Sequence, residues 1–93
     1  MNKRSKGLRA QRLVRKYLED RGYLVYIIPH TRFSKDIFGL FDGFFIKDGV
    51  VGFFQVKSNT KPSMKPYRDF YLKYKVPSKV FVVKDRKGIF VYT

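Results

Sequence analysis

The chain has 93 residues, 44% of them hydrophobic, which predicts a single folded domain spanning residues 1–93 and excludes a disordered protein. Its 21 Lys and Arg residues outnumber 7 acidic residues for a net charge of +14, which indicates nucleic acid as a polyanionic partner unless the basic surface serves only solubility. The lack of cysteine excludes disulfides and thiolate metal sites, and the lack of a signal-peptide-like or membrane-spanning stretch leads us to expect a soluble, cytoplasmic, nucleic-acid-associated protein with no membrane partner.

The first predicted element is a helix over residues 5–21. Apolar residues recur at helical spacing and form one stripe, made of Ala10, Leu13, Val14, Tyr17 and Leu18. Ser5 is the expected N-cap, and Gly22 is the expected C-terminal stop. The polar side of the helix is either a solvated face or a surface that contacts phosphates, and the candidate contacts are Arg4, Lys6, Arg9, Gln11 and Arg12.

Three strands are predicted next. Residues 24–28 form an unbroken β-branched and aromatic run that is ended by Pro29, which predicts a buried strand. The polar connection over residues 30–39 is long for so small a domain, as functional loops often are. Two further strands are predicted over residues 41–46 and 50–57.

The last third of the chain predicts a second helix and a closing hairpin. A polar linker over residues 58–66 leads to a short helix over residues 67–74, whose apolar side is expected to carry Phe70, Tyr71 and Tyr74. Residues 79–83 and 89–92 are the strands of the final hairpin. The expected succession is therefore α-β-β-β-α-β-β.

The central hairpin brings polar groups together. If Asp48-Gly49 is a complete two-residue turn, Asp42 pairs with Gln55 on one face, and Lys57 lies two residues further along that face. A hard cation such as Mg²⁺ prefers oxygen ligands, which the Asp42 carboxylate, the Gln55 amide and the Val56 carbonyl offer. The Lys57 ammonium would orient a bound water or offset transition-state charge. Alternatively, Asp42 ends a turn while Gln55 and Lys57 occupy an exposed strand face.

Asp42 followed by Gln55-Val56-Lys57 resembles the D-x(n)-(D/E/Q)-x-K signature of PD-(D/E)XK nucleases. The segment KGLRAQRLVRKYLEDRGY is similar to the first helix of archaeal-type Holliday junction resolvases, and the similarity covers the first two-thirds of the chain. The resemblance implies an α/β, restriction-endonuclease-like core with a mixed central sheet. It also implies a DNA endonuclease dependent on Mg²⁺ (or Mn²⁺) that acts on four-way junctions as a homodimer. Its catalytic residues would be Asp42, Gln55 and Lys57, and its metal ligands Asp42, Gln55 and Val56.

Two departures from the family pattern weaken the expected metal site. The family usually has an acid at the position of Gln55, although Mrr-type restriction nucleases are similar in using Q-x-K. Resolvases usually carry a Glu on the first helix, where this chain has Gln11. These departures favour an alternative, a DNA-binding module of the same fold with weak or no catalysis. A third alternative is an RNA-associated basic protein.

Other polar residues flank the expected site. Asp36 would add a second carboxylate to the metal site or, as we favour, form a local turn. His30 is a candidate general base, although a loop histidine more often makes a routine hydrogen bond. The remaining candidate contacts to nucleic acid are Arg32, Ser34, Lys35, Ser58 and Asn59.

Overall fold

The computed structural model describes the backbone of residues 3–29 and 36–93 and the side chains of residues 7–29 and 36–93. Its helices and strands follow one another in the succession expected from the sequence. They are α1 (Lys3–Asp20), β1 (Leu24–Ile27), β2 (Gly43–Lys47), β3 (Val50–Ser58), α2 (Lys65–Tyr74), β4 (Ser78–Lys84) and β5 (Gly88–Tyr92).

The strands form one five-stranded sheet in the order β1-β2-β3-β4-β5. All neighbouring strands are antiparallel except β3 and β4, which are parallel and are connected through α2. The expected α/β class and mixed sheet are therefore confirmed. Within the described parts of the chain, neither helix is long and apolar enough to cross a membrane.

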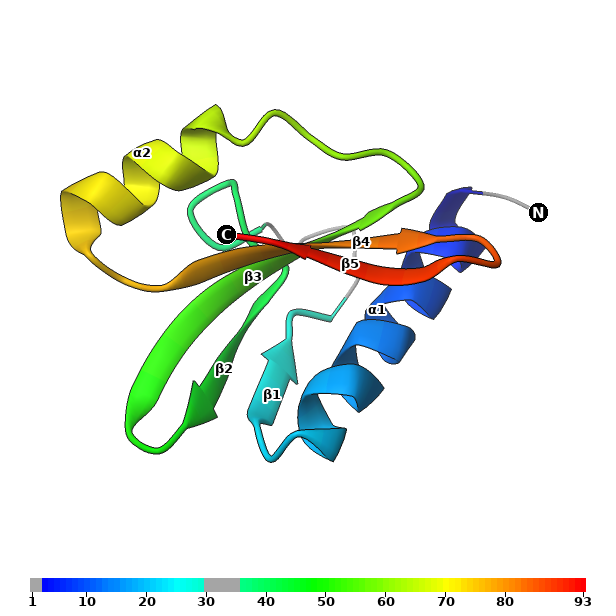
Figure 1. Ribbon diagram of the computed structural model, residues 1–93, viewed down its shortest axis with the longest axis horizontal. Helices are drawn as coiled ribbons and strands as arrows, with labels where there is room; N and C mark the ends of the chain where they lie inside the picture. The colour runs from blue at the N-terminus through cyan, green and yellow to red at the C-terminus, as the bar shows by residue number, and fades with distance from the viewer. Residues whose placement is uncertain (1–2, 30–35) are drawn as a thin grey trace.

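The two helices cover opposite sides of the sheet (Figure 1). The side toward α1, here called the α1 face, buries Ala10, Val14, Leu18, Val25, Phe45, Phe54, Val56, Phe81 and Val83. The side toward α2, here called the α2 face, buries Phe41, Tyr67, Val80 and Val82. A five-stranded sheet of this size thus gains a core on each face, which aromatic side chains largely fill.

The β2–β3 hairpin has the predicted two-residue turn. Asp48 and Gly49 both have positive φ, 53° and 81°, as a type I′ turn requires. Lys47 pairs with Val50, and the same register continues to the pair of Gly43 with Phe54. The register predicted from the sequence is confirmed over β2, although β2 begins at Gly43 and not at residue 41 as expected.

Helix α1 ends as predicted but begins earlier. Gly22 has a φ of 89°, its N–H donates to the Glu19 carbonyl (3.0 Å), and the Tyr23 N–H donates to the Leu18 carbonyl (3.1 Å). This is a Schellman motif, which glycine favours because it has no Cβ. Ser5 lies inside the helix, which begins at Lys3, so its predicted N-cap role is wrong.

Two predictions of burial are also wrong. Strand β1 was expected to be buried, but it forms an edge of the sheet, where Leu24 is 68% exposed and Tyr26 is 46% exposed. On α2 the buried side chain is Tyr67, while Tyr71 and Tyr74 face solvent. In both elements the sequence identifies the apolar residues, but it does not show which of them the rest of the fold covers.

Candidate functional site

Asp42 lies at a bend directly before β2 and is buried, with 8% of its surface exposed. Its N–H donates to the Phe54 carbonyl (2.8 Å), and its Oδ2 accepts a hydrogen bond from the Val56 N–H (2.8 Å). These bonds hold the peptide groups on both sides of Gln55. Asp42 therefore lies across from Gln55, as the hairpin register predicts, but it is held there by its own carboxylate and not by a continued ladder.

Gln55 and Lys57 share the α2 face. Their Cα partners on β4, Val80 and Val82, belong to the core of that face, whereas Val56 between them belongs to the α1 face. Gln55 is only 7% exposed, and its Oε1 is buried without a hydrogen-bond partner. Lys57 is exposed. The alternative that Gln55 lies on an exposed strand face is therefore wrong, because its amide oxygen is buried and accepts no hydrogen bond.

Tyr67 is a buried hydroxyl on which the Asp42 charge acts. Tyr67 comes from the first turns of α2 and packs in the core of the α2 face. Burial raises the pKa of the Tyr67 hydroxyl above its ordinary value, and the negative charges of Asp42 and Asp36 raise this pKa further. Both carboxylates therefore lie close enough to the Tyr67 hydroxyl to act on it.

The donors around Asp42 suit a hard cation. The N–H and C=O of one strand residue point to the same side, so the Val56 carbonyl points to the side from which its N–H meets Asp42. The Asp42 carboxylate, Gln55 Oε1 and the Val56 carbonyl are all oxygen donors, which Mg²⁺ binds together with several waters. Among residues 3–29 and 36–93, no group of three or more His, Cys, Asp or Glu side chains gathers to hold a metal ion. The candidate set is therefore poor in charge.

Gln11 lies near this site but not on the surface. It is 7% exposed and lines a cavity of 170 Å³ that it shares with Arg12, Ile28 and other residues between α1 and the end of β1. The Ile28 N–H donates to the Asp42 carbonyl (2.9 Å), so Gln11 is close to the segment that holds Asp42. A buried amide does not suit the phosphate contact expected for Gln11, whereas Arg12 is exposed and remains a candidate for one.

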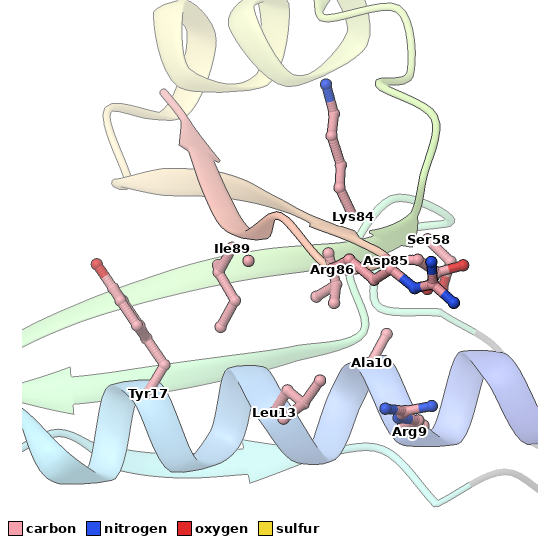
Figure 2. A pocket seen from close by; sticks show the side chains of 11 residues that line it. Arg9, Ala10, Leu13, Tyr17, Ser58, Lys84, Asp85, Arg86 and Ile89 are labelled. Atoms are coloured by element: carbon pink, nitrogen blue, oxygen red, sulfur yellow. The ribbon is translucent and has the colours of Figure 1, made fainter.

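A groove of 810 Å³ lies between α1 and the β4–β5 hairpin; it is called the hairpin groove below. Figure 2 shows Arg9 of α1 and Arg86 of the hairpin turn at the same end, with Tyr17 at the other. Leu13, expected in the buried stripe of α1, is 41% exposed and lines the groove. Ser58 also lines it, so two predicted contacts, Arg9 and Ser58, lie together. Arg86 was not among the predicted contacts.

Asn59 is engaged within the protein. Its amide NH₂ donates to Asp85 Oδ2 (3.2 Å), and the Asp85 N–H donates to Asn59 Oδ1 (2.9 Å). This reciprocal pair ties the end of β3 to the β4–β5 turn. The observed task of Asn59 is thus to position Ser58 and the turn, which differs from the contact to nucleic acid expected for it.

Several predicted site residues fall outside the described residues. These are His30, Arg32, Ser34 and Lys35, together with the side chains of Arg4 and Lys6. No protein-family model, no curated protein and no solved structure matches this chain. The relation to PD-(D/E)XK nucleases therefore stays a prediction, and the function must follow from the chemistry of the site.

Proposed function

We propose that the protein is a Mg²⁺- or Mn²⁺-dependent DNA endonuclease that hydrolyses phosphodiester bonds with an active site made of Asp42, Gln55 and Lys57. In this proposal the sheet and its two helices are a restriction-endonuclease-like core, and the substrate is a branched DNA such as a four-way junction, bound by a homodimer whose two-fold symmetry supplies two sites. The observation that carries the proposal is the buried, unpartnered Oε1 of Gln55, a residue whose two flanking peptide groups are bonded to buried Asp42.

An unsatisfied buried acceptor costs about 1–3 kcal/mol, which a fold tolerates where the group has a ligand to bind. A divalent cation held by Asp42, Gln55 and the Val56 carbonyl would satisfy the amide oxygen. The carboxylate has about four lone-pair sites, so Asp42 can keep its bond to the Val56 N–H while it binds the ion. When bound, the ion would polarise a phosphoryl oxygen and acidify a water.

The protein's own residues supply the rest of the chemistry. Lys57 follows Gln55 by two residues on the same face, and its exposed ammonium can reach a phosphate bound at the site. There it would orient the attacking water and offset the negative charge that grows on the phosphoryl oxygens. Gln55 brings no charge, so the binding of the cation would depend strongly on Asp42 and on the phosphate of the substrate.

The test is a cleavage assay with a synthetic four-way junction and a linear duplex, each with Mg²⁺, Mn²⁺ or EDTA. We expect cleavage only with a metal ion, and a loss on the order of a hundredfold or more in Asp42→Asn and in Lys57→Ala, with DNA binding retained. The matched control is Lys16→Ala, which removes an exposed lysine on α1 and should cleave normally. Gln55→Glu should bind the metal ion more tightly than the natural chain, and Gln55→Leu more weakly.

The second candidate is a DNA-binding module with this fold and without catalysis. The neutral amide at Gln55 favours it, as does the absence of a group of three metal-binding side chains among residues 3–29 and 36–93. Metal-independent binding without products, unchanged by Asp42→Asn and Lys57→Ala, would establish this second function and refute the first.

A further inference from the structure

The turn that precedes Asp42 carries an aromatic side chain at its tip. The Leu40 N–H donates to the Ile37 carbonyl (3.0 Å), and the Ile37 N–H donates to the Phe41 carbonyl (2.8 Å). At the tip, Phe38 has a φ of 54° and is 70% exposed. The turn therefore presents a phenylalanine to solvent in a left-handed backbone conformation.

Neither property of Phe38 is explained by the fold. A bulky residue without a glycine's freedom is strained at positive φ, and such strain of about 1–3 kcal/mol gathers at functional sites. A glycine there would remove the strain, as it does at the next position, where Gly39 has a φ of 68°. The ring contacts the rings of Phe53 and Phe70, but Phe38 stays 70% exposed, so this packing buries only a small part of it. An aromatic side chain at this tip is therefore best explained by something that it contacts outside the chain.

The Phe38 ring belongs to a larger aromatic surface. It lies 5.8 Å from the Phe53 ring, edge to face, and 5.7 Å from the Phe70 ring of α2. Phe70 in turn lies 4.8 Å from the Tyr74 ring, which is 55% exposed. Phe38, Phe70 and Tyr74 are called the aromatic ledge below. The contacts with Phe53 and Phe70 hold the Phe38 ring in position, while the rest of the ring faces solvent.

Positive charges lie at the Tyr74 end of the ledge, whereas Asp36 opens the turn at the Phe38 end. Lys73 Nζ lies 5.3 Å from the centre of the Tyr74 ring, and exposed Lys75 follows at the end of the helix. The acid of α2, Asp69, is paired with Lys65 at 2.8 Å. A polyanion with flat, apolar rings complements both features, which an apolar protein surface does not. Nucleobases on a phosphate backbone are that chemistry.

The ledge is also close to the candidate site. Phe53 precedes Gln55 by two residues on the α2 face, about 7 Å along the strand. Because the Phe38 and Phe53 rings are 5.8 Å apart, the ledge lies within a few nucleotides' length of Gln55. A strand whose phosphate is at Asp42 can thus place a base from the same strand on Phe38, if that base is not paired in a duplex.

We propose that the aromatic ledge stacks an unpaired base of the nucleic acid that the candidate site binds. The substrate class is then DNA with unpaired nucleotides beside the scissile phosphate, as at a branch point or a single-stranded flank. This inference rests on the proposed function for its partner, DNA, but stacking on Phe38 needs neither a metal ion nor cleavage.

The test measures the affinity of the full chain for a fluorescent single-stranded oligonucleotide and for the matching duplex, in EDTA. Phe38→Ala should weaken single-strand binding by about five- to a hundredfold and leave duplex binding within twofold, since one base stack is worth about 1–3 kcal/mol. Phe38→Tyr keeps a ring and should bind normally. Leu72→Ala is the matched control, because Leu72 is an exposed apolar residue of α2 that is 57% exposed.

Three results would overturn the proposal: no DNA binding by the natural chain, equal losses for single strand and duplex, or no loss in Phe38→Ala. A change in the sedimentation of Phe38→Ala would also overturn it, because a second copy would then cover the ledge. Unchanged duplex binding by Phe38→Ala excludes a folding defect as the cause of a loss, and normal binding by Phe38→Tyr shows that the ring is what binding requires. If Phe38→Ala weakens single-strand binding but the natural chain cleaves no DNA, base stacking on the ledge is supported and the proposed nuclease activity is refuted. If the natural chain cleaves DNA and Phe38→Ala has no effect on binding, the nuclease activity is supported and base stacking is refuted.

Discussion

A neutral amide at position 55 affects the stability of the folded state when no cation is bound. A glutamate there would place a second buried carboxylate across from Asp42, and like charges in a desolvated place raise the free energy of the folded state. Gln55 avoids that repulsion, at the cost of one unsatisfied oxygen. The fold is therefore expected to be stable without metal, and metal binding to be weaker than at a site with two acids.

The Tyr67 hydroxyl predicts a specific dependence of stability on pH. Its pKa in the folded state is raised above the ordinary value of 10.0 by burial and then by Asp42 and Asp36. A raised folded-state pKa contributes stability below the unfolded-state pKa, and this contribution is lost as the pH rises through the folded-state pKa. The natural chain should therefore lose more stability than Tyr67→Phe between about pH 9 and pH 12. Urea unfolding of both proteins in EDTA across this range measures the difference.

The matched control for Tyr67→Phe is Tyr26→Phe, since Tyr26 is 46% exposed on the edge strand. That variant should retain the alkaline slope of the natural chain. Asp42→Asn should lower the pKa of Tyr67, because it removes one of the charges that raise it. Identical alkaline slopes for Tyr67→Phe and the natural chain would contradict the burial of the Tyr67 hydroxyl near the two carboxylates.

At the scale of elements, local spacing predicted the turns, while tertiary contacts decided burial. Asp48-Gly49 fixed the hairpin register, and Gly22 ended α1, because each requires a positive φ that a short sequence pattern reveals. The exposure of Leu24 and Tyr26 depends on β1 being an edge strand, which its apolar composition does not show. Helical spacing likewise groups residues on α2 without telling which of them meets the sheet.

The same division holds for the candidate site. Asp42 and Gln55 are joined by a hairpin, so a two-residue turn was enough to predict that they meet. Tyr67 lies on α2, the helix that connects the parallel strands β3 and β4. Arg86 lies in the β4–β5 turn and lines the hairpin groove together with Arg9 of α1, which is far away in the sequence. The local spacing of residues in the sequence predicts neither of these positions. The basic composition of the β4–β5 turn was the available sign for Arg86.

The close approach of β1 to β2 at Gly43 is needed to hold Asp42 in place. A Cβ at Gly43 would lie 2.0 Å from the Tyr26 carbonyl oxygen, and no flexible side chain is there to move. Gly43→Ala should therefore push β1 away and lower the free energy of unfolding by about 3 kcal/mol, as overpacking of backbone does. Urea unfolding measures the loss, and the bond from the Ile28 N–H to the Asp42 carbonyl should exchange its hydrogen faster.

Gly7→Ala is the control for this substitution. Gly7 lies inside α1, and a Cβ there meets no atom within 4 Å. Alanine in a helix interior is more stable than glycine by about 0.5–1 kcal/mol, so this variant should gain stability. If Gly43→Ala unfolds at the same urea concentration as the natural chain, β1 does not approach β2 as closely as described.

At the scale of the whole molecule, 21 basic residues accompany only 7 acidic ones, so the acids are too few to pair with most of the basic side chains. In the described part of the chain, the salt bridges are the exposed helix pairs of Lys16 with Asp20 (3.6 Å) and Lys65 with Asp69 (2.8 Å). Self-repulsion of so many cations opposes folding, and a bound polyanion would relieve it. If the protein binds DNA as proposed, the bound DNA should therefore stabilise the fold.

The two candidate surfaces meet at the end of β3. Lys57 lies on the α2 face with the candidate site, and the next residue, Ser58, lines the hairpin groove on the opposite face. Arg9 and Arg86 stand at one end of that groove (Figure 2). If DNA binds at Asp42 as proposed, its backbone would pass around the end of the sheet and continue into the groove, along one path that includes basic residues of both faces.

Such a path predicts how the salt dependence of binding changes. Each phosphate contact contributes about 0.9 to the slope of log K against log salt for duplex DNA. Arg9→Ala and Arg86→Ala should therefore each lower the slope by about 0.9, and the double variant by about twice that, as anisotropy titrations between about 50 and 200 mM salt would measure. Lys16→Ala removes a lysine that pairs with Asp20 and does not line the groove, so it should leave the slope unchanged. Parallel lines for the natural chain, Arg9→Ala, Arg86→Ala and the double variant would mean that the backbone of the DNA does not enter the groove.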